Sequence, residues 1–363
     1  MGLLLQHKKD QLVADLRWGA ADTVNVFDRN VNYEQYQAYV QWHAKFGDRL
    51  SAQIGAFGLL HSLSNASTIE PRFNISWKPN YRQRLSFAYG QHAMTQPISI
   101  YLSGPKCLFR CNEEPAASDK LYNKTLDLSK SQQFSLNYQL AVSPSFLLKA
   151  EAYYQLYHNI VESVLASGQY TISSLNFGSS GAIFYPHSIF SNLGKGESKG
   201  IEVSLEGKWG KDFSIFASGS LYNATYTNSA QPSRNTAFNG KYNFNLLVDK
   251  RFMLHLAKKN ILHISTAITG AGGRRFTPSQ TNQPWIKDEE RAFEAKYKDY
   301  FRTDLKLGLQ QNFQSFSHTI SLDIRNLFNS RNEYFRQYSR QTGAFVTYYQ
   351  LGFLPLVYYQ VTF

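Results

Sequence analysis

Two pairs of residues carry the groups in this chain that could react or bind a charged ligand. The first pair, Cys107 and Cys111, contains the only cysteines, and it lies between Pro105 and Pro115 in a polar stretch. In an oxidising compartment two thiols at this spacing would form a small loop disulfide. A metal site would need further ligands, and no histidine lies nearby. The pattern therefore favours a disulfide over free thiols or a metal site.

The second pair, Arg274 and Arg275, follows the glycine-rich run 270–273. Paired guanidinium groups could bind an anionic ligand through bidentate hydrogen bonds. Exposed arginines are more often solvated or paired with nearby acids, here Glu289 and Glu290. Ligand contact by Arg274 and Arg275 is therefore the weaker of two interpretations.

Catalytic motifs are missing from the sequence. It has no G-x-S-x-G and no H-E-x-x-H, and its nine histidines are scattered. The glycine-rich segment 194–200 lacks the spacing of a nucleotide-binding loop and precedes an alternating run, not a helix. We expect no enzyme, no metal site and no cofactor, although a catalytic triad assembled only in space would leave no motif.

The elements that must position these residues are indicated by alternation of apolar and polar residues. In 201–209, for example, Ile, Val, Leu, Gly and Trp alternate with Glu, Ser, Glu and Lys. A period of two predicts strands with one apolar and one polar face. A coarse segmentation predicts about 14 strands. They lie near 11–18, 33–46, 49–61, 68–77, 83–96, 130–142, 146–163, 198–210, 213–228, 240–252, 260–272, 300–313, 315–326 and 347–363.

The connections between these strands alternate in length. Short ones lie near 46–49, 78–81, 143–145, 210–212 and 313–315, and long ones near 19–32, 97–129, 164–197, 273–299 and 327–346. Outer-membrane barrels have short periplasmic turns and long outer loops, whereas a Greek-key sandwich has no reason to alternate. The sequence therefore predicts an all-β fold, an antiparallel transmembrane β-barrel with apolar faces toward lipid and polar faces toward the lumen.

The last strand supports the same prediction. Phe363, Val361, Tyr359 and Val357 form one apolar face that ends on an aromatic residue at the carboxylate. Charged residues are 18% of the chain, against about 25% in ordinary soluble domains. The formal net charge of +12 is scattered, which argues against nucleic acid as a partner and suits attraction to anionic lipopolysaccharide.

Short phrases along nearly the whole chain resemble the C-terminal barrel of TonB-dependent outer-membrane receptors, particularly those of Bacteroidetes-type bacteria. The phrases occupy 69–73, 89–92, 151–155, 199–203, 236–240, 272–275 and 323–329. The resemblance implies a 22-stranded barrel in the bacterial outer membrane, closed by an N-terminal plug. It implies import of a scarce nutrient, captured by outer loops, guided by the polar lumen and driven by the inner-membrane TonB complex. The end at Phe363, with Val361, Tyr359 and Val357, is similar to the signal that the barrel-assembly machinery reads.

The chain also departs from that family. It shows no signal peptide, no plug, no TonB-contacting segment and fewer strands. We therefore expect 1–363 to be the C-terminal portion of the barrel, with the N-terminal signal, plug and first strands absent. It would reach TonB only through that missing plug. Two alternatives stay open: a passive, porin-like 14-stranded channel in which 11–18 pairs with 347–363, and a secreted glycan-binding β-sandwich. The sequence does not name the nutrient.

Overall fold

A single curved antiparallel sheet makes up most of the protein. The computed structural model describes residues 2–18, 22–102, 123–163, 173–177, 189–229, 232–255 and 260–363. Fourteen strands follow one another along this sheet in the order of the chain, and a short strand, β10 (Arg234–Asn235), pairs with β9 beside that path. The fourteen are β1 Gly2–Trp18, β2 Asp22–Phe46, β3 Leu50–His61, β4 Ala66–Asn80, β5 Gln83–Met94, β6 Ser129–Ser143, β7 Phe146–Ser163, β8 Phe190–Trp209, β9 Phe213–Thr227, β11 Tyr242–His255, β12 Asn260–Ala271, β15 Tyr300–Asn312, β16 Ser317–Arg325 and β19 Leu354–Thr362.

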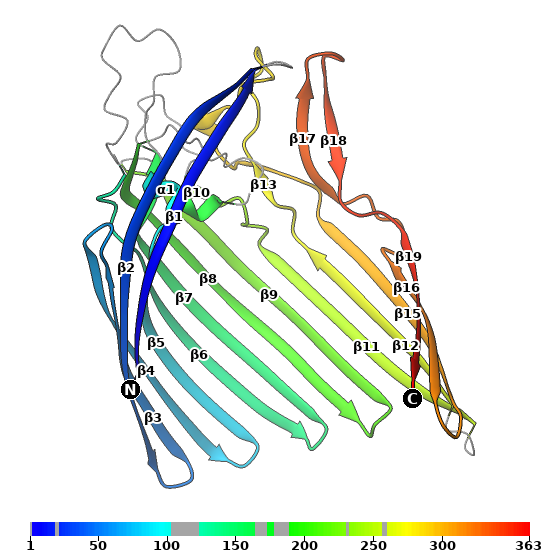
Figure 1. Ribbon diagram of the computed structural model, residues 1–363. Coiled ribbons are helices and arrows are strands. Elements are labelled where there is room, and N and C mark those ends of the chain that lie inside the picture. Colours follow the sequence, from blue (N-terminus) through cyan, green and yellow to red (C-terminus); the bar gives the residue numbers. More distant parts are fainter. Residues whose placement is uncertain are drawn as a thin grey trace, which may run out of the picture.

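The sheet forms a curved wall with two unlike ends (Figure 1). Short turns lie at the lower end, and the longer connections gather at the upper end. The upper connections contain α1 Ile98–Leu102, η1 Ser174–Asn176, η2 Glu289–Arg291 and two small hairpins. These hairpins are β13 Arg275–Phe276 with β14 Ala295–Lys296, and β17 Glu333–Ser339 with β18 Ala344–Tyr349. Among the described residues no helix is long and apolar enough to cross a membrane.

The register of the strands separates the two faces of the wall. Ala150, Val203 and Gly219 lie side by side on β7, β8 and β9, and the next row holds Glu151, Glu202 and Ser220. Because neighbouring residues of a strand point to opposite faces, one face is apolar and the other polar. Ile201 is 58% exposed and Leu221 68% exposed, so the apolar face is covered by no part of the described protein. Such a face requires lipid, as the alternation predicted.

The wall is not closed within the described residues. β1 pairs only with β2, and β19 pairs only with β16. The passive-channel alternative required these two strands to pair with each other, and the structure contradicts it. The β-sandwich alternative required two large sheets packed face to face, whereas the strands form one continuous sheet. The antiparallel barrel wall is therefore the prediction that holds.

Several sequence-based boundaries were wrong, among them the start of β8, which lies at Phe190 and not near 198. β1 and β2 begin at Gly2 and Asp22, not near 11 and 33, so the predicted long connection 19–32 is largely strand. The missed segments break the alternation, with three leucines in a row at 3–5 and three polar residues in a row at 28–30, and alternation is the signal by which such a strand is recognised. The predicted strand 347–363 is in fact two strands, β18 and β19, separated at 350–353. Apolar and aromatic residues continue from β18 through Leu351 and Phe353 into β19, which concealed the break.

The assignment of faces can be tested with an arginine placed on either side of β8. We expect Val203→Arg to lower the free energy of unfolding by about 2–4 kcal/mol, because the charge would lie in lipid. Ser204→Arg, one residue along on the polar face, should cost less than about 1 kcal/mol. Denaturant unfolding in phospholipid vesicles measures both. Equal losses from the two changes would reject the assignment.

Candidate functional site

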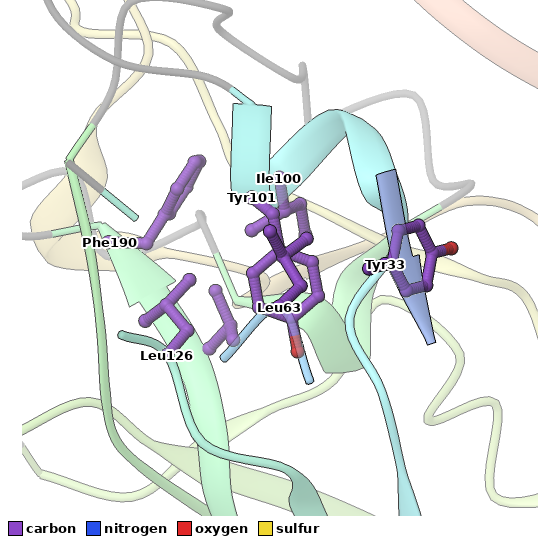
Figure 2. Packing of buried hydrophobic residues seen from close by; sticks show 7 residues of the cluster. Tyr33, Leu63, Ile100, Tyr101, Leu126 and Phe190 are labelled. Carbon is purple, nitrogen blue, oxygen red and sulfur yellow. The ribbon is translucent and has the colours of Figure 1, made fainter. Parts of the chain in front are cut away.

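The upper end of the wall carries a buried apolar cluster that gathers several connections (Figure 2). Its members come from β2, the β3–β4 turn, α1, the segment before β6, and the adjoining ends of β7 and β8. They are Tyr33, Leu63, Ile100, Tyr101, Leu126, Val161 and Phe190. Tyr101 is only 1% exposed, and its hydroxyl accepts a hydrogen bond from the Gln96 amide at 3.3 Å. Because loops usually lie on the surface and move, a cluster of this kind fixes their stems.

Aromatic rings extend this cluster onto the polar face. The His61 ring lies edge-on to Tyr33 at 5.0 Å and close to Tyr101 at 5.3 Å between ring centres. His61 pairs with Gln35 across β2 and β3, and Tyr33 lies two residues before Gln35. The polar face therefore ends, at its upper end, beneath an aromatic cluster.

A buried carboxylate joins two further segments at the same end. Glu162 in β7 is 1% exposed. One of its oxygens accepts a hydrogen bond from the Ser191 hydroxyl at 3.3 Å, and the other accepts from the Ser229 amide at 3.0 Å. The Ser229 hydroxyl donates as well. The sequence analysis missed Glu162, although a lone acid directly after Ile160 and Val161 could have indicated a buried polar group.

Arg275 is bound within the protein. Its amide donates to the Ala237 carbonyl at 2.8 Å, and its guanidinium donates to the carbonyls of Asn239 at 3.1 Å and Glu294 at 3.0 Å. The expected acid partners, Glu289 and Glu290, are not the groups it contacts. Arg274 lies over the Phe238 ring, with its guanidinium carbon 5.4 Å from the ring centre. Contact of Arg274 or Arg275 with a ligand stays a prediction.

Glycines allow the same segments to touch through their backbones. A Cβ atom on Gly272 would lie 1.7 Å from the Gly240 carbonyl oxygen, and one on Gly273 would lie 1.9 Å from that of Tyr297. Asp299 closes this region with three hydrogen bonds. Lys296 donates to it at 2.7 Å, the Gly273 amide at 2.9 Å and the Tyr242 hydroxyl at 2.8 Å.

A charged network fixes the upper ends of β15 and β16. The Asp304 carboxylate accepts from Arg302 at 2.6 Å, from Arg325 at 3.2 Å and from the Asn326 amide at 2.8 Å. The Asn326 side chain then donates to the Leu351 carbonyl at 2.9 Å, directly before β19. This network sets the path of the chain from β16 to the last strand.

Lower on the polar face, a hollow of about 500 Å³ lies over β2 to β6. Its polar and aromatic lining includes Tyr39, Gln41, Phe57, Arg72 and His92, and the small residues Gly55 and Gly90 leave room. Arg72 pairs with the buried Glu70 at 3.1 Å and lies 5.5 Å from the Phe57 ring centre. Amides, a guanidinium and aromatic rings can together hold a polar or anionic molecule by hydrogen bonds and stacking. Sequence reasoning did not find this hollow, because its residues come from five strands.

The remaining predicted residues lie apart from these features. Val357, 70% exposed, and Tyr359, 66% exposed, are on the apolar face with Val361. Phe363 lies at the end of the short turns, with its ring centre 6.4 Å from that of Phe316. Their role as an assembly signal stays a prediction. Cys107 and Cys111 lie outside the described residues. Within the described ranges no three His, Cys, Asp or Glu side chains gather as a metal site.

Comparison with known proteins gives a family model and several solved structures. The model of the TonB dependent receptor-like β-barrel matches residues 6–327. The ferric yersiniabactin uptake receptor FyuA from Yersinia pestis is 13% identical with a TM-score of 0.64, and the match covers 99% of this chain and 50% of that one. The outer membrane transporter YddB from Escherichia coli is 14% identical with a TM-score of 0.62 and the same two coverages, 99% and 50%.

The ferripyoverdine receptor of Pseudomonas aeruginosa is also similar in structure. It is 14% identical with a TM-score of 0.62, and the match covers 95% of this chain and 40% of that one. No curated protein matches the sequence. The chain thus spans about half the length of the solved structures that it matches.

The close backbone contact at Gly272 predicts a large effect of one methyl group. We expect Gly272→Ala to lower stability by about 1–3 kcal/mol, because the Gly240 backbone cannot move aside as a flexible side chain could. Gly219→Ala on β9 is the matched control, since its Cβ would meet nothing closer than 3.9 Å. Thermal unfolding in detergent measures both variants. A Gly272→Ala protein as stable as the control would contradict the argument.

Asp299 predicts a pH-dependent anchor. Its hydrogen bonds, first that from Lys296, hold the pKa of the carboxyl at about 2, below its usual 3.8. A carboxyl with a lowered folded-state pKa adds stability above its unfolded pKa and loses that contribution as pH falls through the folded value. We expect hydrogen exchange in 273–299, corrected for intrinsic rates, to be faster in Asp299→Asn than in the wild type at pH 5–7. The difference should vanish as pH falls to about 2.

Asp288→Asn is the control for this measurement, because the Asp288 side chain makes no hydrogen bond at the start of η2. Its exchange should equal that of the wild type at every pH. A wild-type protein whose protection in 273–299 stays constant down to pH 2 would argue against the anchor.

Proposed function

This chain belongs to the TonB-dependent receptor-like β-barrel family, and we propose that it forms part of the wall of an active outer-membrane transporter for a scarce nutrient. Members of this family are outer-membrane receptors. The feature that supports the proposal best is that one wall carries two unlike faces. Its apolar face requires lipid, and its polar face ends beneath the cluster that holds the outer connections.

Each part of the wall has a role in the proposed transport. The outer connections capture the nutrient, and the clusters around Tyr101 and Glu162 keep their stems in place. The polar face then forms the lumen, where groups such as Arg72 and Gln41 exchange hydrogen bonds with a passing solute. As the solute moves, successive polar groups of the wall replace the water molecules that it loses, so its hydrogen bonds are never all broken at once.

The energy source lies outside the wall. The solved structures are about twice as long as this chain, so we propose that further strands complete the barrel and that a plug domain occupies it. TonB would act on the complex through that plug. The partners of the wall itself are lipid, lipopolysaccharide and, through the strand that ends at Phe363, the barrel-assembly machinery. We propose no catalytic role.

Several classes of nutrient can be tested as the transported solute. The matched receptors for ferric yersiniabactin and ferripyoverdine make ferric chelates the first class to test. Cobalamin, peptides and glycans are the other classes.

The transport proposal predicts a dependence on energy. Radiolabelled ferric chelates, cobalamin, peptides and glycans are supplied in turn to cells that produce the whole protein. We expect the cells to take up one of these compounds, and we expect that uptake to be lost when the gene is deleted. Removal of TonB should abolish the same uptake, and a restored gene should return it. Uptake that continues without TonB would favour a passive pore and overturn the proposal of active transport.

A further inference from the structure

A second hollow of about 500 Å³ lies at the lower end of the polar face, beside the turns that join β2 to β3 and β4 to β5. Its lining is strongly basic. Lys45, Arg49, Lys78 and Arg84 line it together with His43, and Asp48 is the one acid among its lining residues. The rest of the lining is mainly serine, glutamine and asparagine. Basic residues that are scattered along the sequence are therefore brought together in this hollow.

The register places two of these cations on the face that carries polar side chains. Lys45 pairs with Ser51 and Arg84 with Gln139, and Gln53 and Asn137 lie two residues further along on the same face. Lys45, Arg49, Lys78 and Arg84 are all exposed. Lys45 and Arg84 therefore face the space that the curved wall partly encloses, and Arg49 and Lys78 line the same hollow at the end of the short turns.

These four cations differ from other basic residues of the polar face. Lys149 is paired with Glu206, Arg72 with Glu70, and Arg302 with Asp304. Within the described ranges, by contrast, no ion pair involves Lys45, Arg49, Lys78 or Arg84. Four like charges held together on rigid strands and turns repel one another, and a negatively charged ligand would remove that repulsion.

The width of the basic hollow indicates the shape of that ligand. Its cations are carried by β2, the β2–β3 turn, β4 and β5. With neighbouring strands about 4.8 Å apart, this span is roughly 14 Å. One phosphate or carboxylate is too small to contact all four cations. An extended peptide, however, places same-face side chains about 6.6–7 Å apart, so two or three acidic residues match the span, and the serines and amides can bind its backbone.

We propose that this basic hollow, defined by Lys45, Arg49, Lys78 and Arg84, is a docking site for an acidic, extended polypeptide segment at the periplasmic mouth of the barrel. The proposal rests on the proposed function in one respect, because only in a barrel wall are the short turns periplasmic. Electrostatic attraction would bring the segment to the hollow, and the separate positions of the cations would fix its register.

The proposal can be tested by direct binding to the whole protein, with its barrel complete, in non-ionic detergent. The probe is a fluorescein-labelled peptide in which Glu alternates with Ser. Its binding is measured by fluorescence anisotropy at about 50 mM salt. We expect the double variant Lys45→Gln/Arg84→Gln to weaken binding about tenfold. The matched control is Lys208→Gln/Lys211→Gln, which removes the same charge at the β8–β9 turn of the same rim. It should change binding less than twofold.

Four further measurements separate the outcomes. A Gln/Ser peptide should not bind, and raising the salt to about 500 mM should weaken binding of the Glu peptide. Far-ultraviolet circular dichroism should show the same strand content in both variants. The proposal is overturned if the wild type does not bind the peptide, if both double variants lose binding equally, or if inorganic phosphate displaces the peptide at equal concentration, which would indicate a small-anion site. Because this assay involves no uptake, its failure leaves the energy-dependent transport proposal standing, and the reverse also holds.

Discussion

Hydrogen bonding of the backbone in lipid is the constraint on which the whole structure depends. Inside a bilayer no water can satisfy an amide or a carbonyl, so each crossing strand must bond to a neighbour on both sides. The twelve inner strands of the wall meet this demand, because their neighbours in sequence are also their neighbours in space, whereas β1 and β19 each pair on one side within the described residues. That order allows the short turns at the lower end, and the period of two along each strand divides the wall into a lipid face and a lumenal face.

Alternation predicted most of this wall and little of its upper end. Each of the fourteen wall strands was found near its predicted place, because the bilayer imposes a period of two on every crossing segment. The starts of β1 and β2 were missed because apolar and polar residues do not alternate there. The contacts of Glu162, Asp304 and Arg275 could not be predicted, since each joins segments far apart in sequence. The basic hollow was hidden for the same reason, with its cations spread over residues 45 to 84.

The phrases that carried the family resemblance turn out to lie beside one another. Residues 69–73 pair with 89–92 through Arg72 and Gly90, beside the hollow over β2 to β6. Residues 151–155 pair with 199–203, and 236–240 contact 272–275 through their backbones. The phrase 323–329 supplies Asp323, Arg325 and Asn326 to the charged network. All of these contacts join strands or connections of the wall, which explains why the phrases identify a barrel family without naming its nutrient.

The apolar cluster around Tyr101 affects how freely the outer connections can vary. It fixes Tyr101 and Leu126 close together, so the intervening connection begins and ends at the same small patch. The entropy of closing such a connection grows only with the logarithm of its length, and doubling that length costs roughly 0.6 kcal/mol. Because the cluster holds both ends of this connection, residues can be inserted or replaced between Tyr101 and Leu126 at little cost to the stability of the wall. New specificity can arise in such a protein without redesign of its membrane-spanning part.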